Sequence, residues 1–537
     1  MAVAPTDLDQ GSFSDTPPWT LDDPRALVWR QGLEEVRARV MAEVPVLTQP
    51  SRWPPGARMV TVTRRLGSAL ALWALRERRA GDSASRAGIS RRLRIAAERL
   101  GPTYIKLGQI ISSGDGIFPA ELVGEFKLCR DRVPAEPFRL VREVIEADLG
   151  RPLEAVFRWV DRTPLAAASI AQVHAATLRT GERVVVKVQR PTVAKLVRDD
   201  LRVMAWLAPK LVGRIPIAAL ANPPALVELF AQTIAEELDF RLEAENMLDI
   251  ARAFVELGQR GYVVPRPHPT LVTPRVLVME RLDGFRFDDV VGMRDAGVDT
   301  AAVVRTGMIG FVEGAIIHGI FHGDLHGGNL FVMPDGRTAL LDFGITGRLD
   351  ETKRLAFLRL LMGGSVNDVM TQLAALRDLG ALPPDADLAA VARELKLDEP
   401  FVDPLTLSGE QLVGEMQQIV KALLGFGARM PKELMLFVKN MVFIDGAIAN
   451  LAPDLDLFDE VAQISMYFAT QHGDRIAADV GIDPRTIELD MDGVRAGFGV
   501  DGTTERLTHR DLQARRETMR QRLSATSKRG RGKARKS

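Results

Sequence analysis

Cysteine is almost absent from this chain, since Cys129 is the only one among 537 residues. A single cysteine excludes an internal disulfide and is typical of a reducing compartment, so we expect a cytoplasmic protein. Net charge is absent too, because 70 basic residues balance 70 acidic ones, and bulk charge therefore indicates no specific nucleic-acid partner. With 46% hydrophobic residues, the chain has the composition of a soluble globular protein that is long enough for two or more domains.

Long apolar runs are missing as well. No uninterrupted run approaches the ~20 residues that span a bilayer, and the segment up to Asp23 has no basic start before an apolar stretch, so we expect neither a membrane span nor a secretory signal. Leu66–Leu75 comes nearest, but it contains Gly67 and Ser68 and has arginines on both sides. It predicts an amphipathic helix with basic ends, which either packs on another domain or lies peripherally on an anionic membrane surface.

Changes in residue pattern divide the chain into five parts. A helical pattern breaks at Gly101-Pro102, a valine-rich hairpin covers Gln172–Gln189, a helix is expected over Pro224–Leu257, and an apolar strand covers Arg275–Leu282. The last stretch, Thr518–Ser537, carries eight Lys or Arg and no acid. The expected parts are a partly disordered segment, a helical extension, a lobe with strands, a helical lobe and a basic tail, at residues 1–55, 56–150, 151–282, 283–490 and 491–537.

Two motifs near the middle of the chain indicate phosphoryl transfer. Phe321–Phe331 contains Asp324 and Asn329 five residues apart, and Asp342 follows after a short hairpin and opens an Asp-Phe-Gly turn. In the kinase scheme, the first Asp orients the attacking hydroxyl, while the Asn and the second Asp hold Mg²⁺ against the nucleotide phosphates. Oxygen ligands of this kind suit Mg²⁺, a hard cation. We therefore predict Asp324 as the catalytic residue, Asn329 and Asp342 as metal ligands, and ATP or ADP with Mg²⁺ as the cofactors.

A lysine on the predicted hairpin supplies the expected phosphate anchor. Val184, Val186 and Val188 face one side of the strand, and Lys187 faces the other, toward the expected cleft. Such a lysine needs a carboxylate from the following helix. On an ideal helix Asp239 and Glu243 share a face while Glu237 lies about 120° away from Glu243, so two cationic partners could be served.

The glycine-rich loop that covers the phosphates in most kinases is missing. An alanine-rich stretch stands in its place, made of Ala166, Ala167, Ala168 and Ser169. Because alanine methyls restrict φ and fill space, we expect a stiffer phosphate pocket. On the apolar strand, Met279 is expected to guard the back of the adenine pocket, and the backbone of Glu280 to Leu282 to bind adenine.

These residues, together with Gly101–Gln109, closely resemble the UbiB/ADCK group of atypical kinases over about Arg91 to Leu455. The resemblance implies an α+β, protein-kinase-like bilobal fold whose helical N-terminal extension carries a Lys-x-Gly-Gln motif over the cleft, here with Lys106 and Gln109. It implies that Lys187 pairs with Glu243, and that the Glu237-x-Asp239 pair holds Lys106. It also implies ATPase-like activity and a link to isoprenoid quinone biosynthesis or lipid homeostasis.

The chain departs from the family pattern in three places. Many members have Ala-Asp-Pro-His-Pro-Gly-Asn where this chain has Gly323–Asn329, but the Asp, His and Asn are kept, so we expect the chemistry to survive. Ser112–Pro119 replaces a more usual Arg-Pro-Asp stretch, and the C-terminal membrane helices of some bacterial members are not found.

Two other classes of function are compatible with part of the pattern. His322–Asn329 also resembles the phosphotransferases that modify aminoglycosides or choline, but this class does not explain Lys106-x-Gly108-Gln109. A non-catalytic nucleotide-binding module is the other, although Lys187, Asp324, Asn329 and Asp342 are all intact. The sequence indicates neither the phosphate acceptor nor the oligomeric state.

Overall fold

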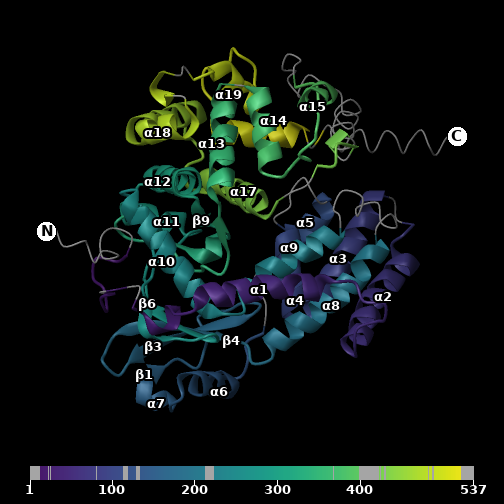
Figure 1. Cartoon of the computed structure of the whole chain (residues 1–537), viewed down its shortest axis with the longest axis vertical. Helices are drawn as coiled ribbons and strands as arrows, with labels where there is room; N and C mark the ends of the chain where they lie inside the picture. Colours follow the sequence, from purple (N-terminus) through teal and green to yellow (C-terminus); the bar gives the residue numbers. More distant parts are fainter. Residues whose placement is uncertain are drawn as a thin grey trace. The chain divides into compact units, whose positions relative to one another are not determined.

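The computed structural model of the chain has two compact units, drawn together in Figure 1. Unit 1 consists of Met1–Arg252, Val263–Asp283 and Leu340–Ile345, and unit 2 of Ala253–Tyr262, Gly284–Ala339 and Thr346–Ser537. The structure describes residues 13–521 apart from 22, 24–25, 80–81, 113–118, 129–133, 212–222, 260, 367, 398–421, 424, 429–430, 482, 487–488 and 520.

Most helices of unit 1 precede or interrupt its strands (Figure 1). They are η1 (Val28–Arg30), α1 (Leu33–Thr48), α2 (Arg58–Arg76), α3 (Asp82–Leu100), α4 (Pro102–Ser112), α5 (Ala120–Lys127), α6 (Phe138–Leu149), α7 (Leu153–Val156), α8 (Val193–Leu211), α9 (Pro223–Glu236) and α10 (Phe240–Glu256), the last of which ends in unit 2.

The predicted helix break at Gly101 and Pro102 fixes how α4 leaves α3. Gly101 has φ +104°, which only glycine adopts readily, and α4 begins at Pro102. Arg58 on α2 binds both the carbonyl of Leu100 and the fully buried carboxylate of Asp200 on α8, the latter at 2.7 Å. One guanidinium therefore joins the end of α3 to α2 and α8.

The sheet of unit 1 has six strands in the order β1-β3-β4-β7-β6, with β2 paired to β3. The predicted hairpin is present, since β3 and β4 pair antiparallel from Ala171 opposite Gln189 to Thr177 opposite Arg183. The predicted apolar strand is β7, which pairs with β4. The strand bounds are β1 (Phe157–Val160), β2 (Ala166–Ala167), β3 (Ala171–Leu178), β4 (Arg183–Gln189), β6 (Pro267–Val272) and β7 (Val276–Glu280).

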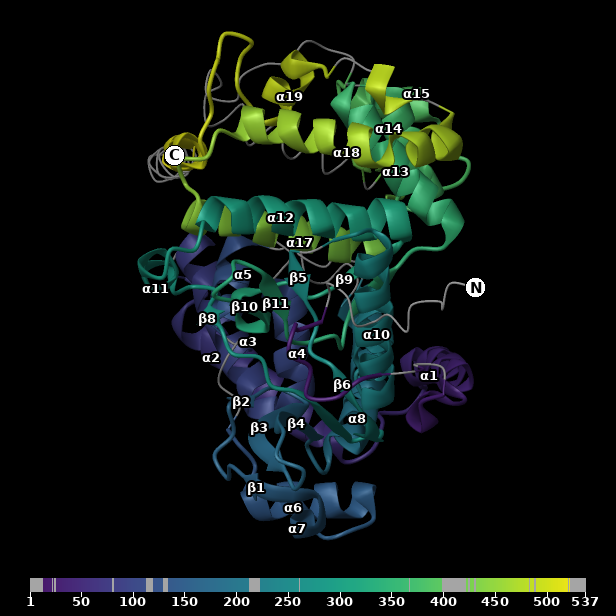
Figure 2. The same ribbon diagram turned by 90° about the vertical axis from the view of Figure 1, so that its left-hand side faces the viewer.

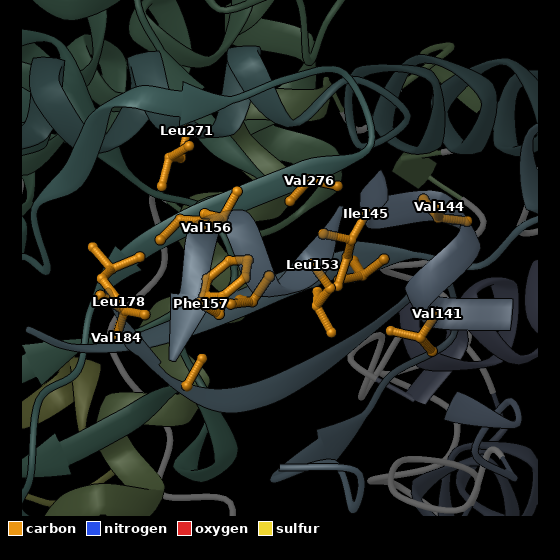
Figure 3. Close-up of a cluster of buried hydrophobic side chains, with 14 residues drawn as sticks. Val141, Val144, Ile145, Leu153, Val156, Phe157, Leu178, Val184, Leu271 and Val276 are labelled. Carbon is orange, nitrogen blue, oxygen red and sulfur yellow. The ribbon is translucent and has the colours of Figure 1, made fainter. Parts of the chain in front are cut away.

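The alternation along β4 decides which way Lys187 points. Val184, Val186 and Val188 are buried in a core with α6, α7 and β7 (Figure 3), which includes Ile145 and Phe157. Because successive side chains of a strand face opposite sides, Lys187 is directed to the other face.

The helix predicted over Pro224–Leu257 is wrong in one respect, because it breaks into α9 and α10 at residues 237–239. At the break, the side-chain amide of Gln189 on β4 donates to the carbonyl of Leu238 at 3.0 Å, and the amide of Phe240 donates to the carbonyl of Pro274 at 3.0 Å. Both backbone groups thus bond to residues outside the helix. These contacts with distant residues break the helix that the local sequence pattern predicts.

Unit 2 is mostly helical, and α12 and α17 run side by side in it (Figure 2). Its sheets are β5-β11-β10-β8 and the pair β12-β9. The bounds are β5 (Tyr262–Val263), β8 (Phe285–Arg286), α11 (Val290–Asp295), α12 (Thr300–Glu313), the π-helical turn η3 (Gly314–His318), β9 (Ile320–His322), η4 (Gly327–Asn329), β10 (Leu330–Val332), β11 (Thr338–Leu340), β12 (Thr346–Arg348), α13 (Glu351–Ser365), α14 (Val369–Asp378), α15 (Leu388–Glu394), α17 (Lys432–Leu451), α18 (Leu457–Val480), η6 (Pro484–Thr486) and α19 (Met491–Gly497).

Two helical stretches of unit 2 are long and apolar enough to cross a membrane by length and composition alone: Thr300–His318 and Lys432–Leu451. The sequence analysis found no such run, because polar residues interrupt both. Two of these polar residues belong to the core of unit 2. Glu313 and Asn440 are completely buried and hydrogen-bonded within unit 2, as in the core helices of a globular domain.

Candidate functional site

Lys187 in unit 1 lies between two carboxylates. Its Nζ is 2.6 Å from Oε1 of Glu243 on α10 and 3.2 Å from Oδ2 of Asp342. The side chains of Lys187 and Glu243 are only 7% and 3% exposed, whereas that of Asp342 is 37% exposed. The ammonium is thus fixed from the buried side and faces a carboxylate that solvent, or a ligand, can reach.

Two carboxylates share this one ammonium, so the cluster has more acidic than basic groups. Burial by itself would lower the pKa of Lys187, but Asp342 and Glu243 raise it above its ordinary value. Burial raises the pKa of Glu243 to about 7 against the opposing effect of Lys187. A site with this balance of charges favours a further cation beside Asp342.

Hydrogen bonds hold the turn that carries Asp342 against α10. The amide of Phe343 donates to Oε1 of Glu243 at 3.3 Å, and Nδ2 of Asn246 donates to the carbonyl of Phe343 at 2.9 Å. The amide of Gly344 donates to Oδ1 of Asp342 at 3.0 Å, which orients the carboxylate. Glu243 therefore positions both the lysine and the Asp-Phe-Gly turn.

A second ion pair lies on the other side of this turn. Nζ of Lys106 on α4 is 2.7 Å from Oε1 of Glu237, and both side chains are largely buried. A β-carbon at Gly344 would lie 3.2 Å from Cγ of Glu237, which shows how closely the pair approaches the turn. The structure thus brings Lys106, Glu237, Lys187, Glu243 and Asp342 into one region of unit 1.

Gly108, the glycine of the Lys-x-Gly-Gln motif, lets α4 dock closely on α5. A β-carbon at Gly108 would lie 2.4 Å from the buried ring of Phe126. Gln109 is on the same helix, one turn after Lys106, and is half-buried. The departure at Ser112–Pro119 falls largely on residues 113–118, outside the described part of the chain.

Asp239 differs from the role that the resemblance implied. Its carboxylate binds Arg241, with the Nη2 to Oδ2 distance at 2.7 Å, and it accepts the amide of Arg241 at 3.1 Å. The structure pairs Lys106 with Glu237.

The alanine-rich stretch is tied down at both ends. Ala166 and Ala167 form β2, and the amide of Ala168 donates to the carbonyl of Ala171 at 2.8 Å. Arg190, which directly follows β4, donates from Nε to the carbonyl of Ala168 at 3.1 Å and pairs with Glu136 at 3.0 Å. Ser169 is buried. These contacts agree with the expected stiffness, and the sequence analysis did not identify Arg190.

The segment expected to bind adenine is partly occupied by its own neighbours. Met279 is buried, as a residue at the back of a pocket would be. The amide of Glu280 donates to the carbonyl of Arg266 at 2.8 Å, so this amide is committed to the sheet. The binding of adenine by the backbone of Glu280 to Leu282 therefore stays a prediction, in which the amide of Glu280 takes no part.

The N-terminal segment also contacts this strand and its neighbour β6. Ser14 donates to the carboxylate of Glu280, and Nη2 of Arg266 donates to the carbonyl of Ser14 at 3.3 Å. The indole of Trp19 donates to the carbonyl of Pro267 at 3.0 Å. Residues 13–21 were expected to belong to a partly disordered segment, yet Phe13 and Leu21 are buried. No motif in this segment predicts its docking.

In unit 2, the loop with Asp324 and Asn329 is held by its own side chains. The amide of Asp324 donates to Nδ1 of His322 at 3.1 Å, and Nδ2 of Asn329 donates to the carbonyl of Asp324 at 3.1 Å. Nδ1 of His326 accepts the amide of Gly328 at 3.1 Å and so caps η4. The two predicted functional residues thus belong to one ordered loop, and His326 shapes it.

Two residues of α17 that the sequence analysis missed contact this loop. Asn440 accepts the amide of Leu325 at 3.0 Å and donates to the carbonyl of His322, while Nζ of Lys439 pairs with the carboxylate of Asp324. They follow Asp324 by more than a hundred residues and match no motif. Among the described residues, no group of three or more His, Cys, Asp or Glu could hold a metal ion.

Comparison with known proteins gives consistent matches. Residues 128–374 match the ABC1 atypical kinase-like domain. An uncharacterized protein of Mycobacterium tuberculosis is 35% identical over 381 residues, which cover 69% of this chain and 76% of that protein. The probable protein kinase UbiB of Aliivibrio fischeri is 32% identical over 380 residues, which cover 69% of each chain.

Two further matches extend to a plant and to a solved structure. The chloroplast protein ACTIVITY OF BC1 COMPLEX KINASE 1 of Arabidopsis thaliana is 32% identical over 374 residues, covering 70% of this chain and 54% of that protein. A solved complex of a Mycobacterium tuberculosis protein with erythromycin is 20% identical, with a TM-score of 0.36, and covers 64% of this chain and 91% of that one.

Proposed function

Because this chain belongs to the UbiB/ADCK family of atypical kinases, which carry the ABC1 kinase-like domain, we propose that it binds Mg-ATP and either hydrolyses it or transfers its terminal phosphoryl group. One observation carries the proposal more than any other. Lys187, Glu243 and Asp342 form a cluster with two carboxylates for one ammonium, in which Lys187 and Glu243 are buried and Asp342 is accessible. A cation on Asp342 and phosphate oxygens on Lys187 would complete its charge balance.

The residues predicted from the motifs would have the same roles as in other phosphoryl-transfer sites. Asp342, assisted by Asn329, would hold Mg²⁺, which neutralises charge on the phosphates. Lys187 would bind the α- and β-phosphates, with Glu243 fixing its position. Asp324 would orient the attacking hydroxyl or water. Catalysis of this kind depends on positioning and electrostatic stabilisation.

The family-specific features would limit what this site accepts. The stretch Ala166–Ser169, tied to Arg190, would cover the phosphates less flexibly than a glycine loop. Lys106, held by Glu237 next to the Asp-Phe-Gly turn, would place a second cation near the phosphates. Both features favour a slow ATPase or a narrow range of acceptors over a general protein kinase.

The cellular role is proposed on the resemblance alone. The pathway would be isoprenoid quinone biosynthesis or lipid homeostasis, in a cytoplasmic protein that contacts the membrane peripherally. On α2, Leu72 and Leu75 are exposed next to Arg76 and Arg78, which suits an anionic lipid surface.

Complementation of a deletion strain, followed by measurement of its quinones and lipids, tests the proposal. A deletion strain complemented with Asp342→Asn should fail to restore an isoprenoid quinone or lipid that the wild-type gene restores, while Asp335→Asn should restore it. Asp335 is a matched control because it is an exposed aspartate in the hairpin before Asp342, paired with Arg337. Full restoration by Asp342→Asn would refute the proposal, and drug sensitivity as the only phenotype would favour a phosphotransferase acting on small molecules.

A further inference from the structure

Helix α17 holds the backbone on both sides of Asp324. The completely buried side chain of Asn440 accepts the amide of Leu325 at 3.0 Å and donates to the carbonyl of His322. These two residues flank the Gly323-Asp324 dipeptide. A single side-chain amide thus fixes the path of the loop immediately before and after the aspartate.

Aromatic packing makes the position of α17 itself well defined. Phe437, one turn before Asn440, packs against Phe311 at 5.2 Å, Phe357 at 5.0 Å and Phe321 at 6.0 Å between ring centroids. Phe321 belongs to β9, which leads directly into the loop. Helix α17 therefore contacts both the strand before Asp324 and the loop around Asp324. These contacts fix the backbone of α17 at Lys439, the neighbour of Asn440.

From this position on α17, the side chain of Lys439 contacts the carboxylate of Asp324. Its Nζ pairs with Oδ1 of Asp324, and both side chains are only 18% exposed. A cation in direct contact, with little access to water, restricts the carboxylate to one orientation. The ion pair of Lys353 and Glu433, also in unit 2, is more exposed, with side chains 33% and 20% exposed.

We propose that Lys439 is a positioning residue for phosphoryl transfer, which holds the carboxylate of Asp324 in one orientation, aimed at the attacking oxygen. This inference rests on the proposed function. In hydrolysis, the bond from the water oxygen to the γ-phosphorus forms as the bond from that phosphorus to the leaving oxygen breaks. ADP leaves with the bonding electron pair, and the proton of the water passes to Asp324 and then to solvent.

The first test compares turnover of Mg-ATP by the full-length chain and by Lys439→Met. Loss of the ammonium should lower kcat roughly 100-fold, the scale of removing one preorganised charge from a site, while KM for Mg-ATP changes little because Lys439 is not assigned to the nucleotide. Lys353→Met should keep the wild-type kcat. A Lys439→Met variant with wild-type kcat would overturn the proposal, and so would a loss that appears only in KM.

Chemical rescue separates positioning from a structural role. The chain has a single cysteine, so Cys129→Ala provides a background in which Lys439→Cys is the only thiol. Alkylation with 2-bromoethylamine rebuilds an ammonium of nearly the length of lysine and should restore most of the lost kcat, whereas iodoacetamide should not. Equal results with both reagents would contradict the charge-based role.

An experiment that does not depend on turnover distinguishes the role of Lys439 from the proposed function. Competitive acetylation followed by mass spectrometry should show Lys439 reacting more slowly in the wild type than in Asp324→Asn, with Lys353 as the internal reference. Equal reactivity would overturn the inference about Lys439 whatever the activity. A wild-type chain without any turnover or nucleotide binding would instead refute the proposed function.

Discussion

Replacing Lys187 by methionine should destabilise unit 1 strongly, because it leaves two carboxylates facing each other. Glu243 is 3% exposed and loses an ion pair of 2.6 Å, while Asp342, 37% exposed, loses one of 3.2 Å. Removing one partner of a buried pair costs about 3–5 kcal/mol. Because Asp342 can turn toward water, we expect the lower end, about 3 kcal/mol of the free energy of unfolding.

The double variant Lys187→Met/Glu243→Gln supplies the decisive comparison. It removes the buried charge as well as its partner, so most of the loss should be recovered, leaving a cost of about 1 kcal/mol for the imperfect hydrogen bonding of the new amide. Lys353→Met, which breaks a more exposed pair in unit 2, should cost less than about 1 kcal/mol.

Tryptophan fluorescence during urea unfolding is a selective assay for these variants. All six tryptophans lie between residues 19 and 206 and therefore in unit 1. The midpoint should fall in Lys187→Met, recover in the double variant and stay unchanged in Lys353→Met. A single variant as stable as the wild type, or a double variant no more stable than the single one, would refute the charge balance described for the cluster.

Two further predictions concern unit 1. Gly108→Ala should lower the melting temperature and weaken nucleotide binding, because its β-carbon would overlap the buried ring of Phe126 and cost about 1–3 kcal/mol. Gly67→Ala is the matched control, because Gly67 also lies inside a helix, α2, and no atom lies within 4 Å of its added carbon. A Gly108→Ala variant with unchanged stability and nucleotide binding would contradict the docking of α4 on α5. Burial lowers the pKa of His268 to about 4, so the stability that its neutral ring provides is present above about pH 6.5 and is lost as the pH falls through 4. After allowance for solvent screening, this loss of stability amounts to about 2 kcal/mol. The variant His268→Asn, which can keep an acceptor for the amides of Thr270 and Leu271, should lose less stability than the wild type between pH 7 and pH 4. Equal losses in the two proteins would exclude His268 as the cause.

Much of unit 1 could be predicted from local pattern. The alternation of valines around Lys187 predicts both the strand and the direction of the lysine, since a period of two leaves no other choice once one face is buried. The Gly101-Pro102 break and the end of α3 follow from the same local rules. The pairing of Lys187 with Glu243 came from the family resemblance, and the structure contains it.

The remaining features depend on contacts that are distant in the sequence. The division of α9 from α10 requires Gln189 and Pro274 to take backbone groups out of the helix. The docking of Ser14 and Trp19 on β6 and β7 joins residues about 250 positions apart. Lys439 and Asn440 lie in an apolar helix with no recognisable motif, so only the folded structure relates them to Asp324.

The most direct test of the account is calorimetric titration of the full chain with ADP in the presence and absence of Mg²⁺, repeated with Asp342→Asn. We expect binding heat that requires Mg²⁺ in the wild type and in Asp335→Asn, and its loss in Asp342→Asn. Wild-type heat from Asp342→Asn, or no heat from any of these proteins, would contradict a magnesium–nucleotide site built on Lys187, Glu243 and Asp342.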